Sequence, residues 1–145
     1  MAKAYIIVYD GTNVLIGIGG CSGPNKKERQ GFHLPGGTID GNNNANQTVL
    51  RELKEETGIA LDEQNITNAI NPINTPNVTF VLAKVESVQA LVQAFSRPPI
   101  ENEFDEPFES LQSLKAADSW DNQNFSQEYL TDWFSYGLKA AREFI

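Results

Sequence analysis

The segment over residues 45–57 constrains the fold most, because the sequence defines a helix there together with both of its ends. Apolar residues recur along it at the three- and four-residue spacing of one helix face. Asn44 and Gln47 match a capping box at the start, and Gly58 suits the left-handed conformation that ends many helices. The pattern therefore predicts a helix over 45–57, against which the remaining segments must pack.

Extended segments are predicted before and after this helix. Residues 4–9 and 14–18 are rich in β-branched and aromatic side chains, and the turn sequence Asp-Gly-Thr-Asn between them predicts an antiparallel pair. Further strands are expected at 66–70, at 78–85 and, shorter, near 108–111.

Two more helix patterns lie in the C-terminal half. Residues 87–95 fit helical spacing, although an extension of the preceding strand remains an alternative. From 129 to 145 an apolar stripe predicts a closing helix, with Ser126 as its cap. Strands interrupted by one central helix, with a helix at the end, predict an α/β or α+β layered fold. The length of 145 residues fits a single domain over 1–145.

Charge and cysteine content narrow the classes of function. The formal net charge of -8 at pH 7 opposes binding to a nucleic-acid polymer or to an anionic membrane surface, since Lys and Arg drive both. Cys21 is the only cysteine, so no intramolecular disulfide can form. The apolar run at 5–9 is too short for a signal sequence or a membrane span. We therefore expect a cytoplasmic protein with no membrane partner.

Three glutamates gather on one face of the predicted helix. Glu52, Glu55 and Glu56 fall within an arc of about 100°. One interpretation is a solvated acidic face in which Arg51 pairs with Glu55. The other is a site for a divalent cation, because Mg²⁺ prefers carboxylate oxygens. The sequence Leu-Pro-Gly-Gly at 34–37 favours the second, since two residues without side chains let backbone N–H groups approach a phosphate.

The sequence from 37 to 59 is similar to the Nudix box, in which a glycine, five residues, a glutamate and seven residues precede Arg-Glu-U-X-Glu-Glu-X-Gly-U, with U aliphatic. The matching residues are Gly37, Arg51, Glu52, Leu53, Glu55, Glu56, Gly58 and Ile59. Asn43 occupies the position of the first glutamate, which in the family helps to hold the loop and the arginine. Because Asp40 lies nearby in sequence, we hypothesise that it pairs with Arg51 instead.

This resemblance implies both a fold and an activity. The implied fold is an α/β/α sandwich with a mixed sheet, one central carboxylate helix and a C-terminal helix. The implied activity is hydrolysis of the pyrophosphate bond of a nucleoside diphosphate derivative, with Mg²⁺, or alternatively Mn²⁺, bridging enzyme and diphosphate. The partner is then a small nucleotide substrate, and many relatives form homodimers. The position of Pro76 after the box resembles a spacing in ADP-ribose hydrolases, so ADP-ribose or another nucleotide sugar ranks first.

The resemblance also assigns roles to the helix residues. Glu52 and Glu56, one turn apart, are the expected main metal ligands, and Glu55 is a third ligand or holds a metal-bound water. Arg51 orients a glutamate. The catalytic set expected on the helix is therefore Arg51, Glu52 and Glu55.

A base for the attacking water is expected from the acidic segment at 101–106. Glu103 is preferred there, because it stands shortly before the predicted strand near 108–111. The alternatives are Glu101, Asp105 and Glu106.

Substrate contacts are expected from residues outside the helix. Gly36 and Gly37 offer their backbone, and Arg29 lies in a polar, glycine-rich loop ahead of the box. Trp120 and Phe125 are candidates for stacking on a base. A second hypothesis, supported by Asn43, is a nucleotide-sensing module that has the same fold and does not cleave its ligand.

Overall fold

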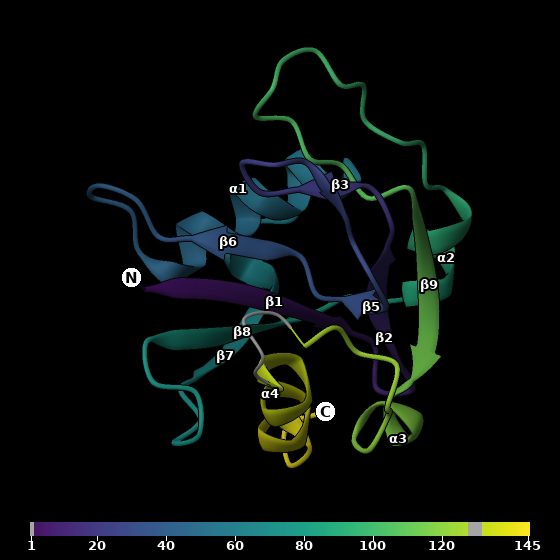
Figure 1. Cartoon of the computed structure of the whole chain (residues 1–145). Helices are drawn as coiled ribbons and strands as arrows, with labels where there is room; N and C mark the ends of the chain where they lie inside the picture. The colour runs from purple at the N-terminus through teal and green to yellow at the C-terminus, as the bar shows by residue number, and fades with distance from the viewer. Residues whose placement is uncertain (1, 128–131) are drawn as a thin grey trace.

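A mixed sheet forms the centre of the molecule (Figure 1). The computed structural model describes residues 2–127 and 132–145 of the chain. The strands of the sheet are β1 Lys3–Tyr9, β2 Asn13–Ile18, β5 Phe32–His33, β6 Gly36–Thr38, β7 Ile66–Ile70, β8 Val78–Lys84 and β9 Ser110–Lys115. They are hydrogen-bonded in the order β5-β2-β1-β8-β7, with β6 paired to β1 and β9 paired to β2. A small separate ribbon consists of β3 (Cys21–Ser22) and β4 (Lys27–Glu28).

The first two strands form the predicted antiparallel pair, with Tyr9 opposite Val14. The carboxylate of Asp10 fixes the turn between them, because it accepts hydrogen bonds from the backbone N–H groups of Thr12 and Asn13 at 2.9 and 2.8 Å. Strand β1 also pairs in parallel with β8 along its whole length. It therefore lies inside the sheet, with a hydrogen-bonded strand on each side.

The central helix α1 spans Ala45–Thr57, as the sequence predicts. The side chain of Asn44 accepts a hydrogen bond from the N–H of Gln47 at 2.8 Å, and the side chain of Gln47 accepts one from the N–H of Asn44 at 3.0 Å. Gly58 ends the helix with a φ of 79°. The predicted capping box and glycine stop are both confirmed.

The other helical segments are short. They are η1 Glu63–Asn65, α2 Val88–Gln93, α3 Ala116–Ser119 and α4 Trp133–Ala141. The segment after β8 is thus helical, and the alternative of a longer strand is wrong. Helix α4 begins at Trp133, whereas Ser126, the predicted cap, donates its backbone N–H to the carbonyl of Phe32 at 2.9 Å. Residues 128–131, which the predicted closing helix includes, lie outside the described residues.

Apolar side chains cover both faces of the sheet, and successive residues of β1 alternate between them. Ile6 packs in one core cluster with Leu53 of α1, and Ile7 packs in the other with Phe134 and Leu138 of α4. A strand buried on both faces has to be apolar throughout, which explains the continuous run in β1. Helices α1 and α4 therefore lie on opposite faces, and the predicted α/β/α sandwich is confirmed (Figure 1).

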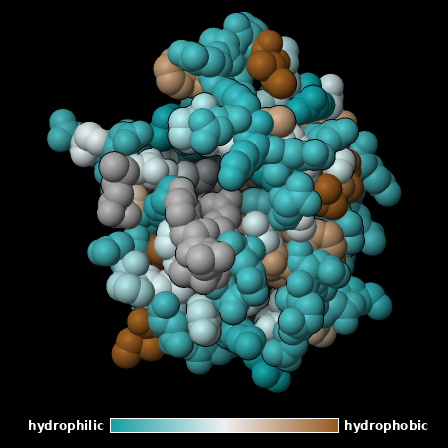
Figure 2. Space-filling model, viewed as in Figure 1, coloured by the Kyte–Doolittle hydropathy of each residue, from teal (hydrophilic) through white to brown (hydrophobic). Residues whose placement is uncertain are grey.

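The surface carries scattered apolar side chains. The face shown in Figure 2 is mainly hydrophilic. Ile73, Ile100 and Phe104 are the most exposed large apolar residues, and all three lie in loops. Single residues of this kind are ordinary on protein surfaces and do not mark a docking site. Across residues 2–127 and 132–145, no helix has the length and apolarity needed to cross a membrane.

Candidate active site

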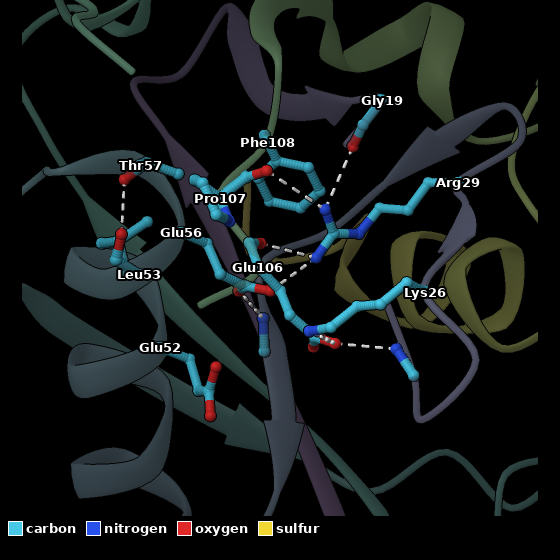
Figure 3. Close-up of polar contacts among 12 residues, drawn as sticks. Gly19, Lys26, Arg29, Glu52, Leu53, Glu56, Thr57, Glu106, Pro107 and Phe108 are labelled. Carbon is cyan, nitrogen blue, oxygen red and sulfur yellow. Dashed lines mark hydrogen bonds and ion pairs between the residues drawn. The ribbon is translucent and has the colours of Figure 1, made fainter. Parts of the chain in front are cut away.

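A pocket of about 380 Å³ lies between α1, β6 and the segment that precedes β9. Its lining includes Arg29, Gly36, Gly37, Glu52, Glu56 and Glu106. Figure 3 shows Glu52 and Glu56 projecting from α1 toward the side from which Arg29 and Glu106 approach. Acidic side chains from two separate segments of the chain thus meet at one pocket.

The three glutamates of α1 do not share this pocket equally. Glu52 and Glu56 line it, and their side chains are 20% and 9% exposed, whereas the side chain of Glu55 is 56% exposed and lies outside it. On a helix Glu56 is rotated only about 40° from Glu52, but Glu55 is about 100° from Glu56. The pocket faces the Glu52–Glu56 side, so the structure does not place Glu55 among the candidate ligands.

The two glycines let strand β6 fit between β1 and α1. Gly36 and Gly37 lie opposite Tyr5 and Ala4 of β1. An added Cβ at Gly36 would overlap the carbonyl oxygen of Ala4, and one at Gly37 would lie 3.1 Å from the carboxylate of Glu52. The backbone N–H of Gly36 donates to Oε1 of Glu56 at 2.9 Å. This glycine N–H therefore positions a carboxylate, although the sequence predicted a contact to phosphate.

Arg29 occupies a different environment from the one expected. The sequence predicts an exposed loop with a cation free to meet the substrate, but Arg29 is only 8% exposed. Its Nη2 lies 3.3 Å from Oε2 of Glu56 in a buried ion pair. The guanidinium is thus engaged by protein groups and does not reach outward for a substrate phosphate.

Glu106, not Glu103, reaches the pocket from the acidic segment. Oε2 of Glu106 accepts a hydrogen bond from the N–H of Gly23 at 2.7 Å and lies 3.7 Å from Nζ of Lys26. Glu103 is exposed and lines only a neighbouring surface hollow, which Glu106 also borders, and its carbonyl accepts a hydrogen bond from Lys26. The carboxylate of Asp105 accepts from two backbone N–H groups at 101 and 102, which folds the segment into a turn whose tip points outward.

A signal for Glu106 was present in the sequence. It immediately precedes Pro107 and Phe108, and Phe108 is 1% exposed. A residue next to a buried aromatic is held closer to the protein interior than the tip of a polar turn. Proximity to the predicted strand near 108–111 also favours Glu106, which is two residues before Phe108, over Glu103, which is five residues before it.

Arg51 pairs within its own helix. Its guanidinium nitrogens lie 3.5 Å from Oε1 of Glu52 and 3.9 Å from Oε1 of Glu55. The hypothesised pairing with Asp40 is wrong, because Asp40 lines the pocket while Arg51 lies on the solvent side of α1. Asn43 is exposed, and its backbone N–H donates to the carbonyl of Asp40 at 3.1 Å, which shapes the turn ahead of α1.

The pocket carries more negative charge than its surroundings neutralise. Burial and the neighbouring charge of Glu55 raise the pKa of Glu52 to about 7, although Arg51 partly opposes this. Burial also raises the pKa of Glu56 well above its ordinary value, with the charge of Glu52 adding to it and Arg29 opposing it. Neighbouring carboxylates that are buried or partly buried and repel one another in this way favour a bound cation.

Other side chains considered for the site are held by packing in this fold. His33 lines the pocket but is buried, and burial with the nearby charge of Arg29 lowers its pKa to about 4, so it is neutral at pH 7. Phe125 packs against Phe32 with ring centroids 5.7 Å apart, and Arg142 lies over the ring of Trp120 at 4.6 Å. Neither aromatic lines the pocket, nor does Pro76, which lies in the loop between β7 and β8.

The donor set fits a magnesium ion shared with a substrate. Within the described ranges 2–127 and 132–145, no three His, Cys, Asp or Glu side chains are grouped closely enough to hold a metal ion by themselves. Mg²⁺, however, is usually held by one or two carboxylates, with water and substrate phosphates as its other ligands. Glu52 and Glu56 supply that number of carboxylates on one wall of the pocket.

The fold is similar to those of several solved structures. It matches an Ap4A hydrolase from C. elegans with a TM-score of 0.56 and 16% identity, over 98% of this chain and 96% of that one. It matches a MutT protein from Methanosarcina mazei Go1 with a TM-score of 0.56 and 14% identity, over 99% and 94%. It matches a UDP-X diphosphatase with a TM-score of 0.57 and 14% identity, over 99% and 63%. No curated protein matches the sequence.

The sequence itself matches a family. Residues 2–134 match the family model of the NUDIX domain, which covers the sheet, α1 and the pocket described above. Most of the chain is included in that match, which ends near the start of α4, so the match concerns the sheet with α1 and not the box alone. The chain therefore belongs to the Nudix hydrolase family.

Proposed function

We propose that the chain is a pyrophosphohydrolase that depends on a divalent cation and cleaves the pyrophosphate bond of a nucleoside diphosphate derivative. The observation that carries this proposal is the convergence of the Glu52 and Glu56 carboxylates on the glycine pair of β6 in one pocket. Family membership supports hydrolysis as the reaction class. Glu56 is buried, Glu52 is partly buried, and the two carboxylates repel each other, which favours a cation between them and a diphosphate.

Each residue of the pocket has its own proposed role in hydrolysis. Glu52 and Glu56 would hold Mg²⁺, which when bound neutralises phosphate oxygens and activates water. Gly36 and Gly37 keep the pocket wall free of side chains, so a diphosphate can approach the backbone. Glu106 enters from the opposite segment and is the proposed acceptor of the proton from the attacking water, in place of Glu103. Water adds to phosphorus as the bridging P–O bond breaks, giving a nucleoside monophosphate and a second phosphate ester.

A nucleotide sugar such as ADP-ribose is the proposed substrate. The names of two structural neighbours, an Ap4A hydrolase and a UDP-X diphosphatase, support a nucleotide in which a phosphate chain is bonded to a second moiety. The pocket of about 380 Å³ lies in the lower part of the range of small-molecule sites. It fits a diphosphate with its cation, and we expect the nucleoside and the sugar to contact the rim.

A substrate panel tests the proposal. The purified chain is incubated with ADP-ribose, UDP-sugars, diadenosine polyphosphates and oxidised nucleoside triphosphates in the presence of Mg²⁺ or Mn²⁺. Release of the nucleoside monophosphate and of the second phosphorylated product is measured by chromatography. We expect cleavage of a nucleotide sugar that stops when a chelator is added, and Glu56→Gln protein prepared in the same way serves as the control for contaminating hydrolases.

Two observations favour a non-catalytic, nucleotide-sensing module. Asn43 stands where the box has its first glutamate and is exposed, and Arg51 pairs with Glu52, one of the proposed ligands. A sensor would bind nucleotides from the panel without releasing products. Saturable binding by calorimetry with no turnover on any substrate would replace the enzyme proposal with this second function.

A further inference from the structure

The guanidinium of Arg29 joins three segments of the chain around the pocket (Figure 3). Nη2 donates to Oε2 of Glu56 on α1 at 3.3 Å and to the carbonyl oxygen of Glu106 at 2.8 Å. Nη1 donates to the carbonyl of Gly19, just after β2, at 3.0 Å and lies 3.5 Å from the carbonyl of Pro107. One side chain thus connects α1, the end of β2 and the segment that carries Glu106.

The packing around Arg29 leaves a fitted space for this side chain. The ring of Phe108 lies against the guanidinium, with Cζ 4.4 Å from the ring centroid. Gly20 has a φ of 77°, and an added Cβ there would overlap the carbonyl oxygen of Pro107 and lie 2.9 Å from Nη1. The side chain of Arg29 is only 4% exposed. Burying a charge is unfavourable unless it is paired and hydrogen-bonded, and the fold supplies both.

The carboxylate of Glu56 is held at both of its oxygens. Gly36 donates to Oε1 at 2.9 Å, and Arg29 donates to Oε2 at 3.3 Å. Two donors on opposite sides leave the carboxylate one orientation. Each oxygen retains a further lone pair, so Glu56 can still act as a ligand. Hydrogen bonds from residues behind a ligating carboxylate commonly orient it and tune metal affinity.

We propose that Arg29 is a positioning residue for the cation site: it fixes the carboxylate of Glu56 and, through the carbonyls of Glu106 and Pro107, sets where Glu106 enters the pocket. The effect of Arg29 on turnover rests on the proposed function, whereas the effect of Arg29 on cation binding does not. The planar guanidinium is required, because Nη2 contacts Glu56 and the carbonyl of Glu106 while Nη1 contacts the carbonyls of Gly19 and Pro107. A lysine has the charge but only one nitrogen, so it cannot make both sets of contacts.

Binding of Mn²⁺ alone tests this role without a substrate. The dissociation constant is measured from the electron paramagnetic resonance signal of free Mn²⁺ for the parental chain, Arg29→Gln and Arg29→Lys. We expect affinity to fall about 10- to 100-fold in Arg29→Gln and by a smaller factor in Arg29→Lys. Arg97→Gln is the matched control, since Arg97 donates to the carbonyl of Phe108 at 3.2 Å but does not line the pocket. Its affinity should equal that of the parental chain.

A double-mutant cycle tests whether Arg29 acts through Glu56. If it does, Arg29→Gln combined with Glu56→Gln weakens Mn²⁺ binding by less than the product of the two single losses. Circular dichroism and thermal unfolding establish that each variant is folded at the assay temperature. If Arg29→Gln does not fold, Arg29→Lys takes its place in the cycle and decides the outcome.

The results separate this inference from the proposed function. The positioning role is overturned if Arg29→Lys and Arg29→Gln both bind Mn²⁺ with the parental affinity. It is also overturned if the loss of affinity in the double mutant equals the product of the losses in the two single mutants. Both conclusions hold even if nucleotides are cleaved. The expected losses without cleavage of any nucleotide uphold the positioning role and refute the enzyme proposal. Where cleavage occurs, a positioning role lowers kcat and leaves the KM for the nucleotide near its parental value.

Discussion

The backbone N–H of Gly36 donates a hydrogen bond to Oε1 of Glu56 over 2.9 Å, which ties the glycine strand directly to the carboxylate helix. The two residues are twenty positions apart in the sequence, separated by the turn that connects β6 to α1 and by most of α1. Because Arg29 donates to the other oxygen, Glu56 is the point at which three segments meet. Predictions about the pocket therefore start from this side chain.

Glu56→Gln should lower the cation-dependent rate by at least about 100-fold, because the site loses a charged ligand that has fixed geometry. The variant should fold but unfold at a lower temperature, since Arg29 keeps its charge and loses its buried partner. Glu55→Gln is the matched control, with the same chemistry one residue away and outside the pocket. We expect it to remain within about tenfold of the parental rate. Equal rates for Glu56→Gln and the parental chain, measured with the best substrate of the panel, would refute the assignment.

Glu106→Gln should lower the rate much more than Glu103→Gln, because only Glu106 lines the pocket. We expect a loss of about 100-fold for a general base and little change for the exposed residue. Initial rates over a range of pH provide the measurement. If Glu103→Gln is the more damaged variant, the base belongs to the tip of the turn and the assignment of Glu106 is incorrect.

Glycine substitutions on β6 should separate folding from function. Gly36→Ala should destabilise the protein strongly, because the added Cβ would overlap the carbonyl oxygen of Ala4 on β1. Gly37→Ala should fold but bind Mn²⁺ more weakly, since its Cβ would lie 3.1 Å from the carboxylate of Glu52. Thermal unfolding and Mn²⁺ titration compare the two. Gly41→Ala, at a position with open space around it and a φ of 57°, shows the cost of backbone strain without a steric overlap.

Without a cation, Glu52 should make the protein less stable as the pH rises from about 4.5 to about 7. Below pH 4.5 the carboxyl is protonated in both states. Between the two values the unfolded chain releases its proton while the folded chain retains it, so the free energy of unfolding falls, and above about pH 7 the loss is complete. A pKa raised from 4.5 to about 7 corresponds to at most roughly 3 kcal/mol.

The comparison with Glu52→Gln isolates this effect, because His33, whose pKa is lowered to about 4, contributes a slope of opposite sign between that value and its ordinary 6.5. In chelator-treated protein, Glu52→Gln should resemble the parental chain at pH 5 and unfold at a higher temperature at pH 7.5. Added Mg²⁺ should raise the Tm of the parental chain more than that of the variant. A constant difference in Tm between the two proteins across this range would show that Glu52 titrates normally.

The parts of the fold that could be predicted are formed by residues that lie close together in the sequence. The caps of α1 at Asn44, Gln47 and Gly58 and the turn after β1 are local hydrogen-bond patterns, so the residues that make them also reveal them. The start of α4 was predicted less well, because an apolar stripe gives the buried face of a helix but not its first residue. The spacing of Glu52 and Glu56 likewise placed both on one face.

The sequence by itself determined the apolar strands, the capped carboxylate helix and the Nudix box, because each depends on residues that are a few positions apart. Only the tertiary structure decided which acids share the pocket: Glu56 and Glu106 are fifty positions apart, and Arg29 holds both. The tertiary structure also buries Arg29, which the sequence predicts at the surface, in an ion pair with Glu56. The physical reason is that burial and charge pairing depend on segments that pack together in space. A local sequence pattern does not determine which distant segment packs against it.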